Sequence, residues 1–294
     1  MTAVILIAVV MTSACKKEGS TQVTEVTDQE AQTISSESET AEADYDDITE
    51  IGLSVGADLE VAAETNNGEI PMTAAGVTTG IRVKLDFFEN LFHKVGPCTE
   101  ITVEPNDGSF PRTVTIDYGE GCLCRDGKFR KGAIVLYFTT PIRRPGAELT
   151  ITFRDFYVNR RHIEGTKTIT NLTADGALKY SVQVKDGKVT WPSGRGFTFA
   201  RLKVVTQIFG MDTRIIRDDI FSIEGRSKTE YTNGMVVTKN TETALIKPVA
   251  CPFIVQGKVK IKINRREFFI DFGTGECDNK ALLIWANGQV EIRL

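Results

Sequence analysis

From residue 98 onward, hydrophobic and polar residues alternate with the period of two that β-strands require. Val259, Ile261 and Ile263, for example, point to one face of a strand while the lysines between them point to the other. No run beyond residue 98 shows a long helical period. The pattern therefore predicts that residues 98–294 are all-β, an antiparallel β-meander of sequential hairpins, arranged as a two-layer sandwich or as one long twisted sheet.

Turn signals divide these alternating runs into hairpins. Asn-Gly and Asp-Gly tolerate the positive φ angles of tight hairpin turns. They predict that Phe221–Tyr231 pairs with Met235–Leu245 across Asn233-Gly234, and that Ala177–Lys185 pairs with Lys188–Trp191 across Asp186-Gly187. In 148–158 the alternation changes phase, which predicts a β-bulge near Arg154-Asp155.

The β body contains two internal repeats. The stretch Thr115–Cys122 (TIDYGEGC) returns as Phe269–Cys277 (FIDFGTGEC), and in each copy a cysteine beside a proline precedes it. Ile163-Glu164-Gly165 also returns, as Ile223-Glu224-Gly225. We interpret both repeats as signs of a duplicated β unit.

Five cysteines lie in the β body, and the repeat suggests how they pair. Cys251 and Cys277 close the second unit. In the first unit, Cys98 pairs with Cys124 if the spacing is kept and with Cys122 if the position relative to the Asp-Gly turn is kept, so one cysteine stays unpaired. Disulfides are expected in an exported chain.

The N-terminus has the pattern of a targeting segment. Residues 1–14 hold an apolar block that is too short to span a membrane, and they are predicted to be a signal peptide. The following run, Thr12-Ser13-Ala14-Cys15, resembles the lipobox of bacterial lipoproteins. This resemblance implies that Cys15 is lipidated and becomes the first residue of the mature chain.

The segment after Cys15 is strongly acidic. Residues 16–50 hold eleven Asp or Glu and two Lys, against a net charge of −4 for all 294 residues. Its few aliphatic residues predict a lipid-anchored, disordered acidic linker over 15–50. Residues 51–97 are predicted to be an irregular segment with one short helix around residues 57–64. The weak positive charge that remains in the body does not support nucleic-acid binding.

Two groups of residues are candidates for binding sites. Asp117, Asp271 and Asp278 lie in Gly-rich turns that suit either Ca²⁺ or the closing of the turn by side-chain hydrogen bonds. A second group combines Arg residues with an aromatic ring, which suits an anionic ligand; it comprises Arg143, Arg154, Tyr157, Arg160 and Arg161. The sequence has no nucleophile elbow, phosphate loop or dinucleotide fingerprint, so we expect neither an enzyme nor a cofactor.

The duplicated unit also resembles a group of exported Bacteroidota lipoproteins. The likeness rests on Cys98…Thr-Ile-Asp-Tyr-Gly-Glu-Gly-Cys122 and on Cys251-Pro252…Ile270-Asp-Phe-Gly-Thr-Gly-Glu-Cys277, and it covers 98–294. It implies a β-rich, lipid-anchored protein of the outer membrane, exposed to the periplasm or the cell surface, and a Cys98–Cys122 bridge. We therefore expect a non-enzymatic binding or envelope-structural role with an envelope protein or glycan as partner; the alternative is a glycan-binding or glycan-processing component of a polysaccharide system.

Overall fold

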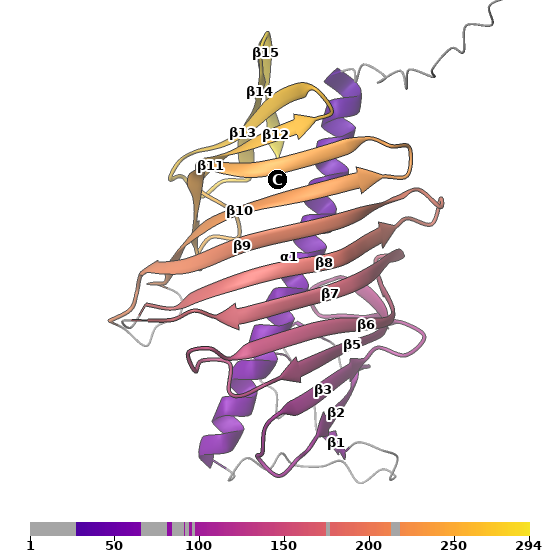
Figure 1. Ribbon diagram of the computed structural model, residues 1–294, viewed down its shortest axis with the longest axis vertical. Coiled ribbons are helices and arrows are strands. Elements are labelled where there is room, and N and C mark those ends of the chain that lie inside the picture. The colour runs from indigo at the N-terminus through magenta and orange to yellow at the C-terminus, as the bar shows by residue number, and fades with distance from the viewer. Residues whose placement is uncertain are drawn as a thin grey trace, which may run out of the picture.

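The computed structural model describes residues 28–65, 81–83, 91, 94–95, 98–174, 177–212 and 218–294. They form one helix and one large sheet (Figure 1). The helix α1 is Asp28–Thr65. The strands are β1 (Ile81–Val83), β2 (Glu100–Glu104), β3 (Arg112–Asp117), β4 (Cys122–Leu123), β5 (Phe129–Phe138), β6 (Glu148–Val158), β7 (Arg161–Asn171), β8 (Lys179–Thr190), β9 (Gly196–Phe209), β10 (Ile220–Tyr231), β11 (Val236–Pro248), β12 (Gln256–Ile263), β13 (Arg266–Thr274), β14 (Lys280–Trp285) and β15 (Gly288–Arg293).

The sheet is an antiparallel meander in which each strand pairs with its neighbours in the chain. The order runs from β1 to β15 without a crossover, and only β4 lies off this path, paired with β5. This confirms the all-β meander predicted from the sequence and decides for one long twisted sheet rather than a two-layer sandwich. The hairpin across Asn233-Gly234 is also confirmed, since the backbone N–H of Tyr231 donates to the Met235 carbonyl at 2.8 Å.

The predicted turn at Asp186-Gly187 is wrong. Residues 179–190 are a single strand, and the two residues form a bulge within it, where the register against β9 shifts between Val184 and Gly187. Asp186 has a φ of 50°. A positive φ fits a bulge as well as a hairpin turn, so the Asp-Gly signal alone does not distinguish the two.

The largest correction concerns α1. Residues 28–50, which we expected to belong to a disordered linker, and residues 51–65, expected to be mostly irregular, form one helix of 38 residues that crosses a face of the sheet (Figure 1). The remainder of that linker, the signal peptide and Cys15 lie outside the described residues. In the part of the chain that the structure describes, no helix is long and apolar enough to cross a membrane.

The buried face of α1 explains why this acidic segment folds. Eight of its buried positions recur at alternating intervals of four and three residues, which places them on one stripe of a helix. The stripe consists of Ile34, Ser38, Ala41, Tyr45, Ile48, Gly52, Val55 and Leu59. Three of these are small or polar residues, so the hydrophobic content of the segment is low although its spacing is helical.

Glycine brings α1 close to the sheet at the C-terminal part of the helix. A Cβ atom on Gly52 would lie 2.9 Å from Cδ2 of Leu149, and one on Gly56 would lie 2.6 Å from Cγ2 of Ile142. Real Cβ atoms do not approach other atoms this closely, so larger residues at these positions would push the helix away. The missing side chains allow α1 to pack directly against β6 and the segment that precedes it.

Candidate functional site

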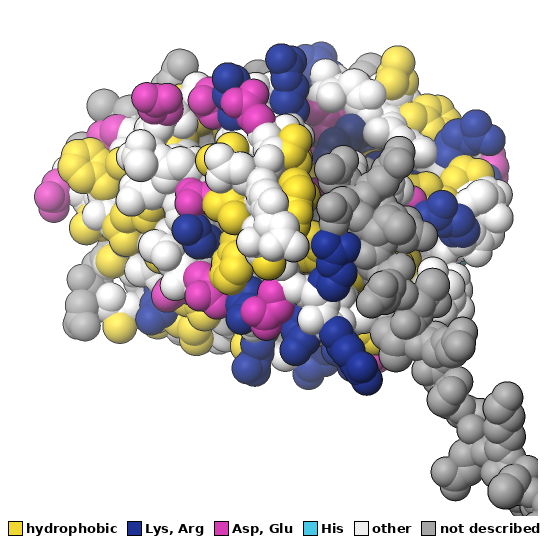
Figure 2. All heavy atoms as spheres, turned by 90° about the horizontal axis from the view of Figure 1, so that it is seen from above, with side chains coloured by type: hydrophobic (Ala, Val, Ile, Leu, Met, Phe, Trp, Pro, Cys, Tyr) yellow, Lys and Arg dark blue, Asp and Glu magenta, His cyan; other side chains and the backbone are white. Residues whose placement is uncertain are grey.

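An acidic helix lies against a basic face of the sheet, and the interface between them buries several charged side chains. On the surface seen from above, Lys and Arg side chains likewise lie among Asp and Glu side chains (Figure 2). We call its central part the charged seam. It comprises Glu39, Glu42 and Asp46 of α1, Arg201 and Lys203 of β9, and Lys239 of β11. All three cations have side chains that are less than 15% exposed.

The ion pairs of the charged seam share partners. Nζ of Lys239 lies 2.5 Å from Glu39 and 3.0 Å from Glu42, and Arg201 lies 3.3 Å from Glu42. Arg201 and Lys203 both bind the Asp46 carboxylate, Lys203 at 2.7 Å. Because each cation removed from water has at least one carboxylate beside it, the desolvation cost of burial is offset.

The pKa values in the seam follow from these contacts. Burial alone would raise the pKa of Asp46, but Arg201 and Lys203 outweigh burial and hold that pKa far below its ordinary value. The pKa of Glu42 is lowered in the same way, against burial, by Lys239 and Arg201. Burial would lower the pKa of Lys239, but Glu39 and Glu42 raise it above its ordinary value. These groups are therefore charged together at neutral pH.

A second charged cluster holds the middle of α1 against β5 and β7. The guanidinium of Arg130, which is fully buried, binds Asp47 of α1 and lies 2.6 Å from Asp126. Arg161 binds Asp44 of α1 at 2.7 Å. Burial would lower the pKa of Arg130, but the nearby carboxylates raise it. Each of these cations holds α1 in place, which is a structural task rather than a catalytic one.

Tyr45 of α1 and Lys167 of β7 meet between the two clusters. The Tyr45 hydroxyl donates to the Glu164 carbonyl at 2.6 Å, and Lys167 donates to the backbone carbonyl of Tyr45. The Lys167 side chain is completely buried, and burial lowers its pKa well below the ordinary value, with Arg201 adding to the effect. Sequence reasoning did not find this site, because the segment with Tyr45 was taken for a linker; the helical spacing of the buried stripe was the available signal.

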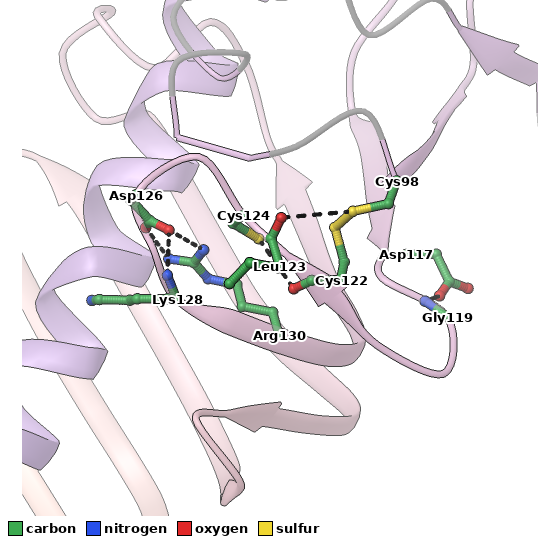
Figure 3. The surroundings of a disulfide bond; sticks show 9 residues. All are labelled: Cys98, Asp117, Gly119, Cys122, Leu123, Cys124, Asp126, Lys128 and Arg130. Atoms are coloured by element: carbon green, nitrogen blue, oxygen red, sulfur yellow. Dashed lines mark hydrogen bonds and ion pairs between the residues drawn. A yellow bond between two sulfur atoms is a disulfide. The ribbon is translucent and has the colours of Figure 1, made fainter.

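The structure brings the two predicted cysteine pairs together. Cys251 and Cys277 have Cα atoms 5.9 Å apart, and Cys98 and Cys122 have Cα atoms 5.7 Å apart, both within bonding geometry. Cys122 rather than Cys124 is therefore the partner of Cys98, as the family resemblance implied. Cys124 is free and buried, and its thiol lies near the Cys122 carbonyl (Figure 3).

The candidate Ca²⁺ residues act as turn formers. The carboxylates of Asp117, Asp271 and Asp278 each accept a hydrogen bond from the backbone N–H two residues later, at 2.8, 3.1 and 3.0 Å; Figure 3 shows the first of these turns. Lys258 also lies 3.0 Å from Asp271. Within the described ranges, no group of three or more metal-binding side chains is close enough to hold an ion.

The predicted anionic-ligand patch is not assembled. Arg143 precedes β6 and binds Glu60 at 3.1 Å, whereas Arg160 and Arg161 follow β6, so the strand of 11 residues, roughly 35 Å long, separates the two ends. Arg161 is turned toward Asp44 of α1, and the ring of Tyr157 stacks on His162. Arg143 and Arg161 therefore pair with α1 and do not join one patch, whereas Arg154 and Arg160 are exposed.

The bulge predicted near Arg154-Asp155 is confirmed, and it opens the sheet. Ile151 pairs with Lys167 and Phe156 pairs with Ile163, but the residues between them on β6 and β7 are out of register. Asp155 has a φ of 45°. A cavity of about 390 Å³ lies here, lined by Phe153, Asp155, His162, Ile163, Glu164 and Gly165.

Neighbouring strands hold this opening in place. A Cβ on Gly132 of β5 would lie 1.9 Å from the backbone oxygen of Asp155, and one on Gly165 would lie 2.7 Å from the Cα of Gly187 on β8. Gly165 belongs to the repeated Ile-Glu-Gly motif, and the second copy, at Gly225, also lies at a shift in register, between Ile223 and Arg226. The repeat therefore marks positions where the sheet bulges.

Comparison of the chain with protein-family models, with curated proteins and with solved structures gives no match.

Proposed function

We propose that the protein is a lipid-anchored lipoprotein of the outer membrane with a non-enzymatic binding or envelope-structural role. The observation that carries this proposal is the pair of disulfides, one in each copy of the duplicated unit. Disulfides persist in oxidising compartments outside the cytosol. They agree with the signal-peptide pattern of residues 1–14 and with the lipobox-like run that ends at Cys15.

The position of α1 changes the expected arrangement at the membrane. The helix begins at Asp28, thirteen residues after Cys15. Even a fully extended chain of that length spans at most roughly 45 Å. An anchored Cys15 therefore keeps the start of α1 within that distance of the lipid surface, rather than at the end of a stalk that extends to residue 50.

Lipid anchoring is tested on the full chain expressed in a Gram-negative host. We expect labelled palmitate to be incorporated and the protein to partition into detergent, and Cys15→Ala to abolish both. A count of free thiols in denaturant adds an independent readout: a lipidated chain has only the Cys124 thiol, whereas an unmodified chain also has that of Cys15. Two free thiols in the membrane fraction would overturn the proposal.

A second candidate function is glycan binding in a polysaccharide system, and the cavity between β6 and β7 favours it. The cavity combines two carboxylates and an imidazole with apolar side chains. Small-ligand sites likewise place polar groups beside apolar side chains. Titration of the purified protein with glycans tests this function separately from anchoring.

A further inference from the structure

The opening between β6 and β7 combines hydrogen-bond acceptors with an apolar floor. Asp155 and Glu164 lie on either side of His162, with Nε2 of His162 3.9 Å from the Asp155 carboxylate and Nδ1 3.5 Å from that of Glu164. Phe153, which is partly exposed, lines the same cavity, and the fully buried Ile163 borders it. The side chains of Asp155 and Glu164 are 68% and 39% exposed, so a ligand from solvent reaches both.

We propose that this cavity binds an uncharged sugar residue of a glycan. The proposal rests on the second candidate function, glycan binding, and gives that function a site and a ligand class. Ionised carboxylates only accept hydrogen bonds, and sugar hydroxyls donate them. Hydrogen bonds to a charged acceptor are about twice as strong as neutral ones. The C–H face of a sugar ring, in turn, packs against the apolar floor formed by the partly exposed ring of Phe153.

The charge balance of the cavity selects against acidic sugars. Lys188 lies 2.9 Å from Glu164 and offsets that carboxylate. Lys131, on the neighbouring strand β5, is bound to Glu120 at 2.7 Å and also interacts electrostatically with Asp155. An acidic sugar would bring its own carboxylate against those of Asp155 and Glu164, which only accept hydrogen bonds, in contrast to the anionic ligand expected from the arginines in the sequence.

Contacts from neighbouring side chains hold part of the cavity lining in place, which lowers the entropic cost of binding a ligand. Tyr45 of α1 supports it from the helix side, because its hydroxyl donates to the Glu164 carbonyl and its ring lies 6.3 Å from that of Phe153. The ring of Tyr157 stacks on His162 with centroids 4.5 Å apart and fixes the orientation of the imidazole. Ligand binding therefore orders few additional side chains.

The repeat supplies a matched control. Glu224 stands in the second Ile-Glu-Gly motif, at a bulge of β10, and is exposed. Glu164→Gln and Glu224→Gln make the same chemical change in the same local sequence, but only the first removes a carboxylate from the cavity. Asp155→Asn tests the opposite wall, and an unchanged melting temperature shows that each variant is folded.

The experiment titrates the full chain in detergent with maltohexaose, cellohexaose and mannohexaose, and with hexamers of glucosamine and galacturonic acid, by calorimetry and by backbone amide shifts. We expect at least one neutral hexamer to bind and to shift the backbone amide signals of residues 153–165. Glu164→Gln and Asp155→Asn should each weaken the affinity for that hexamer by about tenfold or more, whereas Glu224→Gln should leave the affinity unchanged. Binding of the galacturonic acid hexamer alone, equal loss in Glu224→Gln, or no binding of any neutral hexamer would overturn the proposal. None of these outcomes affects the anchoring of Cys15, which is measured separately.

Discussion

The hydroxyl of Tyr45 donates a hydrogen bond to the backbone carbonyl of Glu164, 119 residues further along the chain. Tyr45 is completely buried, and its ring lies 5.3 Å from that of Phe199 on β9. Burial raises its pKa, so the hydroxyl keeps its proton throughout the ordinary pH range. A single residue of α1 thus connects the helix with β7 and β9.

Tyr45→Phe should lower the free energy of unfolding by about 1 kcal/mol, because the Glu164 carbonyl loses its partner while the ring remains. Tyr45→Ala should cost about 3–5 kcal/mol, since it also leaves a cavity between α1 and the sheet. Urea denaturation followed by circular dichroism measures both. Tyr137→Phe, on an exposed tyrosine of β5, is the control; an equal loss in that variant would contradict the assignment.

Lys239→Met should destabilise the protein by about 3 kcal/mol, because Glu42 and Glu39 lose a shared buried partner. The matched control is Lys228→Met on the adjacent strand β10, where the ion pair with Glu230 is about half exposed. Exposed pairs contribute less than about 1 kcal/mol. If both substitutions have the same effect on the urea midpoint, the charged seam does not hold α1.

Stability should fall as the pH is lowered below about 4. The pKa of Asp46 and that of Glu42 are lower in the folded chain than in the unfolded chain, so the folded state resists their protonation. Their contribution is complete above the unfolded pKa of about 4 and is lost as the pH falls toward the folded value. Urea titrations between pH 7 and pH 3 should show this slope, and Asp46→Asn should make it shallower. A slope unchanged in Asp46→Asn would show that other carboxylates cause it.

Gly56→Val should cost about 1–3 kcal/mol, because the added methyl groups would displace Ile142 or lift the helix from the sheet. Helix propensity opposes this effect, since glycine is the poorer helix former of the two. Ala43→Val on the exposed face of α1 controls for the β-branched side chain. Thermal unfolding should therefore separate the two variants, and equal melting temperatures would argue against close packing at Gly56.

The sequence predicted the sheet better than the helix, for a physical reason. Alternation along a strand is visible in one short window, as in Val259, Ile261 and Ile263, and local turn residues mark where strands end. The helix α1 buries Ser38, Ala41 and Gly52 on the same stripe as Ile34 and Tyr45, so composition pointed to disorder. Its carboxylates are neutralised by cations up to 200 residues away, which no local window reveals.

The candidate sites likewise divide into those that nearby residues predict and those that depend on contacts between distant residues. The disulfides and the turns at Asp117 and Asp271 depend on residues within about 26 positions of each other. The repeat indicated the Cys251–Cys277 pair, and the family resemblance indicated Cys98–Cys122. The Arg patch failed because sequence proximity does not say which end of a strand a residue occupies. The cavity at Asp155 and Glu164 was signalled by two separate observations, a phase change in β6 and the Ile-Glu-Gly repeat, but their meeting depends on the register between β6 and β7.

The chain begins α1 long before it completes the surface on which α1 lies. Glu42 contacts Arg201, and Ile34 accepts a hydrogen bond from Tyr231 at a separation of 197 residues. Contacts between such distant residues cost much loop entropy, so folding that depends on them is slow. The carboxylates of α1 can therefore reach their partners on β9 and β11 only once those strands are in place, so the helix depends for its position on the part of the chain that is made last.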